Sequence, residues 1–258
     1  MTIREYLENP MGKGDSSIPN RAALIASLNE KYLSLDRRKG KDIKMTIYRV
    51  PLKNEYYFHL IIPSETERDN TYDVVFRFFD PENAHNRELT ISGFDIQVFT
   101  NTPSFAYTFA YAYRQSGLLI EWLSKKLGKK PVTQQAVVRN KFGLINFDKY
   151  LYFGAKYILE SKHMNRIAIE STSIPMNRAG FERKIRSLEQ IMREYDTAKS
   201  KLRTEKRHVK KSTRTKVSGT TMSGDAGLYN RNNKKPTPPM KASKSVKHPK
   251  TVKRLSKK

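Results

Sequence analysis

The fold is decided by four consecutive runs, IKMTIYRV (43–50), EYYFHLII (55–62), YDVVFRFF (72–79) and ELTISGFDIQVF (88–99). β-Branched and aromatic residues dominate these runs, and such residues favour strands. The connector PLKN (51–54) is short enough for a hairpin, whereas PSETERDN (63–70) and DPENAHNR (80–87) are longer loops. This order predicts an antiparallel meander, with Gly93 marking a bulge in the last strand.

A helical pattern precedes the four runs. Pro19 and Asn20 open a segment whose apolar residues at 24, 25, 28, 32 and 35 share one face of a helix. We expect this helix, over 20–36, to dock on the sheet. Residues 1–17, which end in MGKGDSS, predict a flexible arm. The glycines of MGKGDSS do not form a phosphate-binding loop, because no strand precedes them and the full motif spacing is absent.

Helical signals also follow the runs. Thr102, Pro103 and Gly117 suit the cap, the first turn and the stop of a helix over 103–115, although the alternating aromatic residues inside it also fit a strand. The segments LLIEWLSKKLG (118–128) and FDKYLYFGAKYILES (147–161) predict further helices, and RIAIES (166–171) predicts a short strand. The fold class is therefore α+β, an antiparallel sheet packed against helices.

The segment NRAGFERKIRSLEQIMREYDTAKSKL (177–202) predicts one long amphipathic helix. Its apolar residues step by four, three, four and three, as in a heptad seam, but a coiled coil needs about three to four heptads. Packing on its own domain and pairing with a second copy both remain open. The candidate assembly face consists of Phe181, Ile185, Leu188, Met192 and Tyr195.

Positive charge gathers at the C-terminal end. The chain has 258 residues and a net charge of +25, and 19 of its 50 Lys and Arg lie in 201–258 beside only two acidic residues, Glu205 and Asp225. Apolar periodicity stops near 205, which predicts a single domain over 18–204 and a disordered tail over 205–258. Lys and Arg at this density neutralise phosphates and release counterions without reading bases. The expected partner is nucleic acid, DNA in the first instance, bound through Lys206, Arg207, Lys210, Lys211, Arg214, Lys216, Lys234, Lys235, Lys241, Lys244, Lys247, Lys250, Lys253, Arg254, Lys257 and Lys258.

Other classes of protein have little support. The chain has no cysteine, which excludes a disulfide framework and a thiolate metal site. The start MTIREYLENP has no apolar core of a secretory signal, and no stretch approaches the roughly 20 apolar residues of a spanning helix. We therefore expect a protein that is neither secreted nor inserted in a membrane.

The densest polar cluster is DPENAHNRE (80–88), with Asp80, Glu82, His85 and Glu88. Carboxylates and an imidazole suit a hard cation, but their spacing matches no metal motif, so a solvated turn is expected. His59 is expected to be a half-buried sheet residue. We predict no catalytic residue, no metal and no cofactor, and a metal-dependent nuclease is the more distant alternative.

The runs DIQVFTNTPSFAYTFAYAY and LLIEWL, followed by FDKYLYFGAKYI, resemble small virion-associated structural proteins of tailed bacteriophages that infect Gram-positive bacteria. The resemblance covers about 80–160 and contains no catalytic motif. It implies a non-enzymatic component of the head, neck or connector, located in the virion or the cytoplasm of the infected host. It also implies other particle proteins as partners, while pairing with a second copy of the chain rests on the heptad spacing of 181–195. The nearer alternative is a DNA- or RNA-binding regulator or chaperone that acts through its folded domain.

Overall fold

A computed structural model describes residues 1–8, 21–36, 43–50, 53–65, 70–85, 87–136, 140, 145, 148–161 and 164–215. The strands β1 (Lys44–Arg49), β2 (Glu55–Pro63), β3 (Thr71–Phe79) and β4 (Asp95–Thr100) form the predicted antiparallel meander. A short fifth strand, β5 (Ile174–Pro175), pairs with β1 in parallel, giving the order β4-β3-β2-β1-β5. The α+β class is confirmed.

The fourth predicted strand is shorter than expected. Residues 88–94 form bends, with an isolated bridge from Thr90 to Asn165, and β4 begins only at Asp95. Gly93 therefore precedes the strand and does not form a bulge in it. A Cβ atom on Gly93 would lie 3.0 Å from the ring of His85, so the absent side chain permits a close approach between two parts of this loop.

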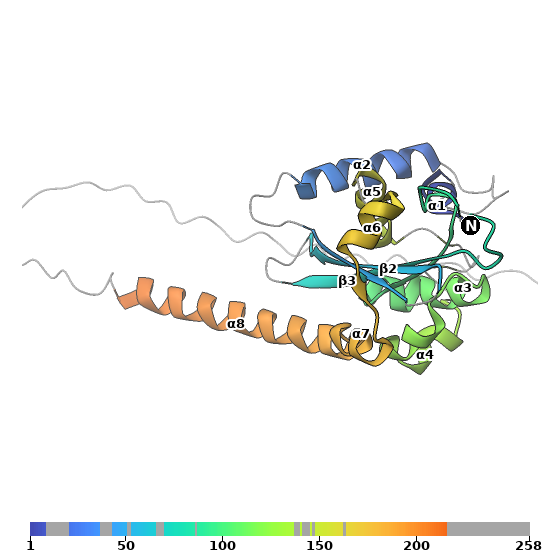
Figure 1. Cartoon of the computed structure of the whole chain (residues 1–258). Helices are drawn as coiled ribbons and strands as arrows, with labels where there is room; N and C mark the ends of the chain where they lie inside the picture. The colour runs from blue at the N-terminus through green and yellow to red at the C-terminus, as the bar shows by residue number, and fades with distance from the viewer. Residues whose placement is uncertain are drawn as a thin grey trace, which may run out of the picture. The chain divides into compact units, whose positions relative to one another are not determined.

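One face of the sheet is covered by α5 (Lys149–Glu160). A Cβ atom on Gly154 would lie 2.9 Å from the Phe76 ring, so the α5 backbone rests almost directly on β3. The helix α2 (Arg21–Asp36) was expected to dock on the sheet, but α5 lies between them (Figure 1). Tyr32 of α2 donates a hydrogen bond to Glu160 (2.9 Å) at the end of α5.

Residues 1–8 are not a flexible arm. They contain α1 (Ile3–Glu8), whose Ile3 and Tyr6 are buried in the core. The Ile96 amide of β4 donates to the Met1 carbonyl (2.9 Å), and the Tyr6 and Tyr113 hydroxyls lie 2.8 Å apart. The prediction failed because a six-residue helix offers too few positions to show a period; the rest of the predicted arm, 9–17, lies outside the described residues.

The other face carries a second helical layer (Figure 1). Residues 103–115 are helical, as favoured, but Phe105–Phe109 form a π-helix before α3 (Ala110–Gln115). A 3-10 helix, Glu121–Leu127, and α4 (Lys129–Thr133) follow, where one helix over 118–128 was expected. The rings of Tyr57, Trp122 and Phe181 pack together here with centroids 5.8–6.0 Å apart.

The predicted strand at 166–171 is wrong, because these residues form α6 (Arg166–Thr172). The Asn165 side chain accepts hydrogen bonds from the Ile167 and Ala168 amides, which caps the helix. Only Ile169 of α6 is buried. The Asn165 cap and the burial of this one side chain therefore stabilise a helix against the strand preference of the β-branched residues.

The predicted long helix over 177–202 is two helices. The first, α7 (Arg178–Lys184), ends where Ile185 adopts an extended backbone, and α8 (Leu188–Thr215) begins after Ser187. The Gln190 amide donates to the Ser187 hydroxyl (3.2 Å) while the Ser187 amide donates to the Gln190 side chain (2.7 Å). This reciprocal pair is a capping box, which starts a helix afresh at this point.

Residues 1–210 group into one compact unit, which includes α1 as well as the predicted domain 18–204. The helix α8 continues to Thr215, so 205–215 are helical, and 216–258 lie outside the described residues. In the part of the chain that the structure describes, no helix is long and apolar enough to cross a membrane.

Candidate nucleic-acid interface

The charge of α8 changes along its length. Its first turns mix Glu189, Arg193, Glu194 and Asp196. From 199 to 215 the only acidic residue is Glu205, and eight are basic: Lys199, Lys201, Arg203, Lys206, Arg207, Lys210, Lys211 and Arg214. These last 17 residues span roughly 25 Å at 1.5 Å per residue. A continuous helical segment therefore carries an almost purely cationic sequence.

Helical spacing orders these cations. Lys199, Arg203, Lys206, Lys210 and Arg214 step by four, three, four and four, the spacing that aligns residues along one side of a helix. Ile191 is the last buried residue of α8 among those whose exposure the structure describes. The basic half of the helix thus follows the part that is anchored in the core.

The predicted phosphate-binding residues divide into two groups. Five of them, Lys206, Arg207, Lys210, Lys211 and Arg214, lie on α8 and not in an unstructured tail. The other eleven lie outside the described residues: Lys216, Lys234, Lys235, Lys241, Lys244, Lys247, Lys250, Lys253, Arg254, Lys257 and Lys258.

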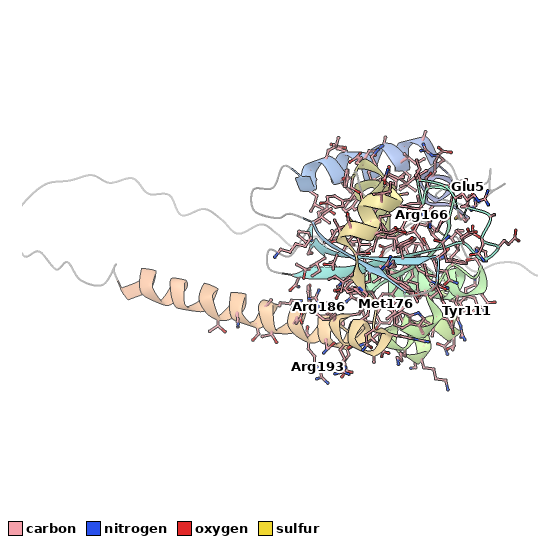
Figure 2. All side chains as sticks on the ribbon, viewed as in Figure 1. Glu5, Tyr111, Arg166, Met176, Arg186 and Arg193 are labelled. Carbon is pink, nitrogen blue, oxygen red and sulfur yellow. The ribbon has the colours of Figure 1, made fainter. Side chains whose placement is uncertain are left out.

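Arg186 anchors the start of α8 to the sheet, and Figure 2 labels it near the junction of α7 and α8. Its Nε donates to Asp73 Oδ2 (3.0 Å), and its Nη2 donates to the carbonyl and hydroxyl oxygens of Thr71 (2.9 and 3.0 Å). Its Nη1 donates to Glu194 on α8 (3.1 Å). One guanidinium therefore joins β3 to the first turns of the basic helix.

Asp73 is the buried centre of this anchor. Its side chain is 2% exposed, and it also accepts hydrogen bonds from Asn101 Nδ2 and His59 Nε2, both at 2.8 Å. Burial acts to raise the pKa of Asp73, but the His59 hydrogen bond and the Arg186 charge outweigh it, so the pKa is lowered. His59, expected to be half-buried, is buried. A closed, fully bonded cluster of this kind orients an element and leaves little room for a substrate.

The candidate assembly face lies largely in the core of its own domain. Phe181, Ile185 and Leu188 are 2%, 0% and 5% exposed, which favours the interpretation that this segment packs on its own chain. Met192 is exposed and Tyr195 is half-buried. Because α7 and α8 are separate helices, the five residues do not form one continuous seam.

The polar cluster at 80–88 is a loop held by its own carboxylate. Asp80 accepts from the Ala84 amide (3.0 Å) and the His85 amide (2.8 Å), which closes the turn. Glu82 and Glu88 are exposed. Across the described residues, no group of three or more His, Cys, Asp or Glu is arranged to hold a metal ion. The expected solvated turn is therefore only partly right, because the Asp80 side chain that closes it is 2% exposed.

The anchor of α8 was not predicted from the sequence, although one signal for the start of this helix was present. Ser187 and Gln190 stand in capping-box spacing immediately before an apolar run, which marks a helix start inside 177–202. No local pattern places Asp73 beside Arg186, because the contact joins residues 113 positions apart.

Comparisons with known proteins return no match: no family model, no curated protein and no solved structure is significantly similar to this chain.

Proposed function

We propose that this protein is a non-enzymatic structural component of a nucleic-acid-containing particle, whose basic C-terminal segment binds DNA without sequence preference. The observation that carries the proposal is the density of charge from 199 onward, which begins on a helix. Of the 50 Lys and Arg in the chain, 19 lie in 201–258 beside only two acidic residues. The resemblance to virion-associated phage proteins supports the particle and suggests its other structural proteins as partners.

The physical basis is counterion release. Duplex DNA carries about one negative charge per 1.7 Å, so a helical segment roughly 25 Å long passes several phosphates. Each neutralised phosphate adds about 0.9 to the slope of log affinity against log salt. Contacts of this type position a protein on DNA but carry no sequence information. The expected binding is therefore tight at low salt, weak at high salt and insensitive to sequence.

The folded domain has a different role in this proposal. Arg186 joins β3 to α8, so the basic segment starts from a fixed point on the sheet. A domain that docks on other particle proteins holds such a segment close to packaged DNA, which raises its effective concentration there.

The test uses two matched variants of the full-length chain. In the first, five cations of α8 (Lys206, Arg207, Lys210, Lys211 and Arg214) are changed to Gln, which keeps helix propensity and removes charge. In the control, five exposed cations of the domain, Arg4, Lys31, Lys44, Lys53 and Arg87, are changed to Gln. Binding to a random-sequence duplex is measured by fluorescence anisotropy across a salt series.

We expect the α8 variant to lower the salt slope by several units of about 0.9 each, and the control to leave it nearly unchanged. Two unrelated duplex sequences should bind the wild type equally. An equal effect of the two variants would show that only the overall charge matters, and a strong preference for one duplex sequence would point to base reading by the domain. Either result would contradict the proposal.

A further inference from the structure

A pocket of about 220 Å³ lies in the helical layer that covers the second face of the sheet, between the π-helix, α3 and α4. Tyr107, Thr108 and Tyr111 line it from the π-helix and α3, and Lys130, Pro131 and Gln134 line it from α4 and the residue that follows. Figure 2 labels Tyr111 beside α3 and α4. Pockets for drug-sized ligands occupy about 300–1,000 Å³, so this one suits a single ring system.

The π-helix decides which aromatic rings face this pocket. Phe105 and Phe109 are buried, whereas Tyr107 is 54% exposed and Tyr111 is half-buried. The Ala110 amide bonds to the Phe105 carbonyl, the i to i+5 pattern of a π-turn. Asn140 then donates its side-chain amide to the Thr108 carbonyl (3.0 Å), which fixes the widened turn. π-Turns are rare and are frequent at functional sites.

Tyr107 is one of the few large side chains that stay more than half exposed on the described part of the fold. Large apolar and aromatic side chains that remain more than half exposed on a folded domain are available for contact with a ligand. A flat aromatic face at the mouth of a small pocket stacks most readily on another flat ring. This feature alone does not separate a nucleobase from an aromatic or proline-rich peptide.

The charge around the pocket distinguishes a nucleotide from a peptide as its ligand. Among the described residues no acidic side chain lines the pocket, whereas Lys130 does, and Lys130 and its neighbour Lys129 are both exposed. Within the described part of the chain, neither lysine forms a salt bridge with an acidic side chain. The Gln134 amide adds a hydrogen-bond donor and an acceptor at the same place. A planar ring that carries an anionic group matches all of these features.

We propose that this pocket binds one nucleotide of a single-stranded nucleic acid, with the base stacked on Tyr107 and its phosphate near Lys130. Aromatic stacking of this kind tolerates every base, because each base has a π-face. The inference rests on the proposed function, since it adds a single-strand contact on the domain to the phosphate binding of the basic segment. The chain's own segment PTPPM (236–240) is a poorer occupant, because cationic residues flank it and the edge of the pocket is also cationic.

The test compares full-length wild type, Tyr107→Ala and Tyr107→Phe. The probe is a fluorescent single-stranded DNA of roughly six nucleotides, within the 4–16 nucleotide range of single-strand sites. Binding is measured at a salt concentration at which the random-sequence duplex of the salt series no longer binds, so that the basic segment contributes little. Since Tyr107 is exposed, neither substitution disturbs the core.

We expect Tyr107→Ala to weaken single-strand binding by about 5- to 150-fold, the range for loss of one stacked base, and Tyr107→Phe to retain it. Lys130→Gln should weaken it less and flatten its salt dependence. Equal affinity of wild type and Tyr107→Ala would overturn the pocket, and so would Tyr107-dependent binding of a KKPTPPMK peptide without binding of the oligonucleotide. The duplex salt slope, recorded in the same series, tests the basic segment independently. A result that contradicts the pocket therefore leaves the proposal for the basic segment intact, and the reverse also holds.

Discussion

Changing Asp73 to Asn tests whether the buried carboxylate anchors α8. Asn has almost the same shape but no charge, and it presents an amide N–H₂ where one acceptor oxygen stood. The native carboxylate accepts from His59, Asn101 and Arg186 at 2.8–3.0 Å, and its side chain is only 2% exposed. The substitution therefore leaves at least one buried donor unsatisfied.

The magnitude follows from these contacts. Breaking a buried ion pair by removing one partner costs about 3–5 kcal/mol. Arg186 is 26% exposed and keeps its bond to Glu194, so the lower end, about 3 kcal/mol, is expected. Asp73→Asn, Arg186→Gln and the double variant form a cycle whose coupling energy should reach about 1–3 kcal/mol. The exposed pair Arg193 and Glu189 supplies the control, because Arg193→Gln should cost less than about 0.5 kcal/mol.

The assay is denaturation in urea, followed by circular dichroism, with the change read from the midpoint at constant slope. The pH dependence is a second check. The pKa of Asp73 is lowered by folding, so its stabilising contribution is present above the ordinary value of 3.8 and is lost as the pH falls through the folded value. The gap between wild type and Asp73→Asn should therefore narrow below about pH 4. A loss under 1 kcal/mol at pH 7, or no coupling in the cycle, would refute the anchor.

Three further predictions concern the core. Burial raises the pKa of Asp148, whose carboxylate caps α5 and accepts a hydrogen bond from Thr102. Asp148→Asn should keep the cap, so urea denaturation at pH 7 should show equal or higher stability than in the wild type. Asp148→Ala removes the cap and should lose about 1–2 kcal/mol in the same assay. A Cβ on Gly154 would lie 2.9 Å from Phe76, so Gly154→Ala should cost about 1–3 kcal/mol in the same assay, and an unchanged midpoint would contradict the close packing of α5 on β3. Phe109 is 8% exposed, so Phe109→Asp should abolish cooperative thermal unfolding. A cooperative transition retained in this variant would show that 103–123 is not part of the core.

The sheet was predictable because its signal is local. The runs at 43–50, 55–62 and 72–79 differ from β1, β2 and β3 by no more than one residue at either end. β-Branched and aromatic residues fill both faces of these strands, and short polar connectors fix their order. The helix over 147–161 was also predicted, and it forms as α5, capped by Asp148 and buried on most of its sides.

The errors arose where a few side chains decide the structure. The six residues of α1 bury only Ile3 and Tyr6, too few positions for a period to show. The caps at Asn165 and Ser187 overrode the strand composition of 166–171 and the apparent continuity of 177–202. The π-helix at Phe105–Phe109 has no sequence rule, since it depends on the fit of the aromatic rings to the sheet.

The location of the candidate interface was predictable from its charge, but its helical conformation and its anchor to the sheet were not. Counting Lys and Arg located the basic segment, and the end of the apolar periodicity placed the domain boundary near 205. The helix continues to Thr215 because Lys and Arg are good helix formers, which the charge count does not register. The anchor through Arg186 and Asp73 was out of reach, since it joins residues distant in sequence.

The most direct measurement of the central claim is the salt dependence of duplex binding by the full-length chain and by a chain ending at Thr204. The last buried residue of α8 whose exposure the structure describes is Ile191, so the truncated chain should keep its cooperative melting transition. The account predicts a steep salt slope for the full-length chain and loss of duplex binding on truncation. Unchanged affinity in a truncated chain that still melts cooperatively would contradict the account and place nucleic-acid binding on the folded domain.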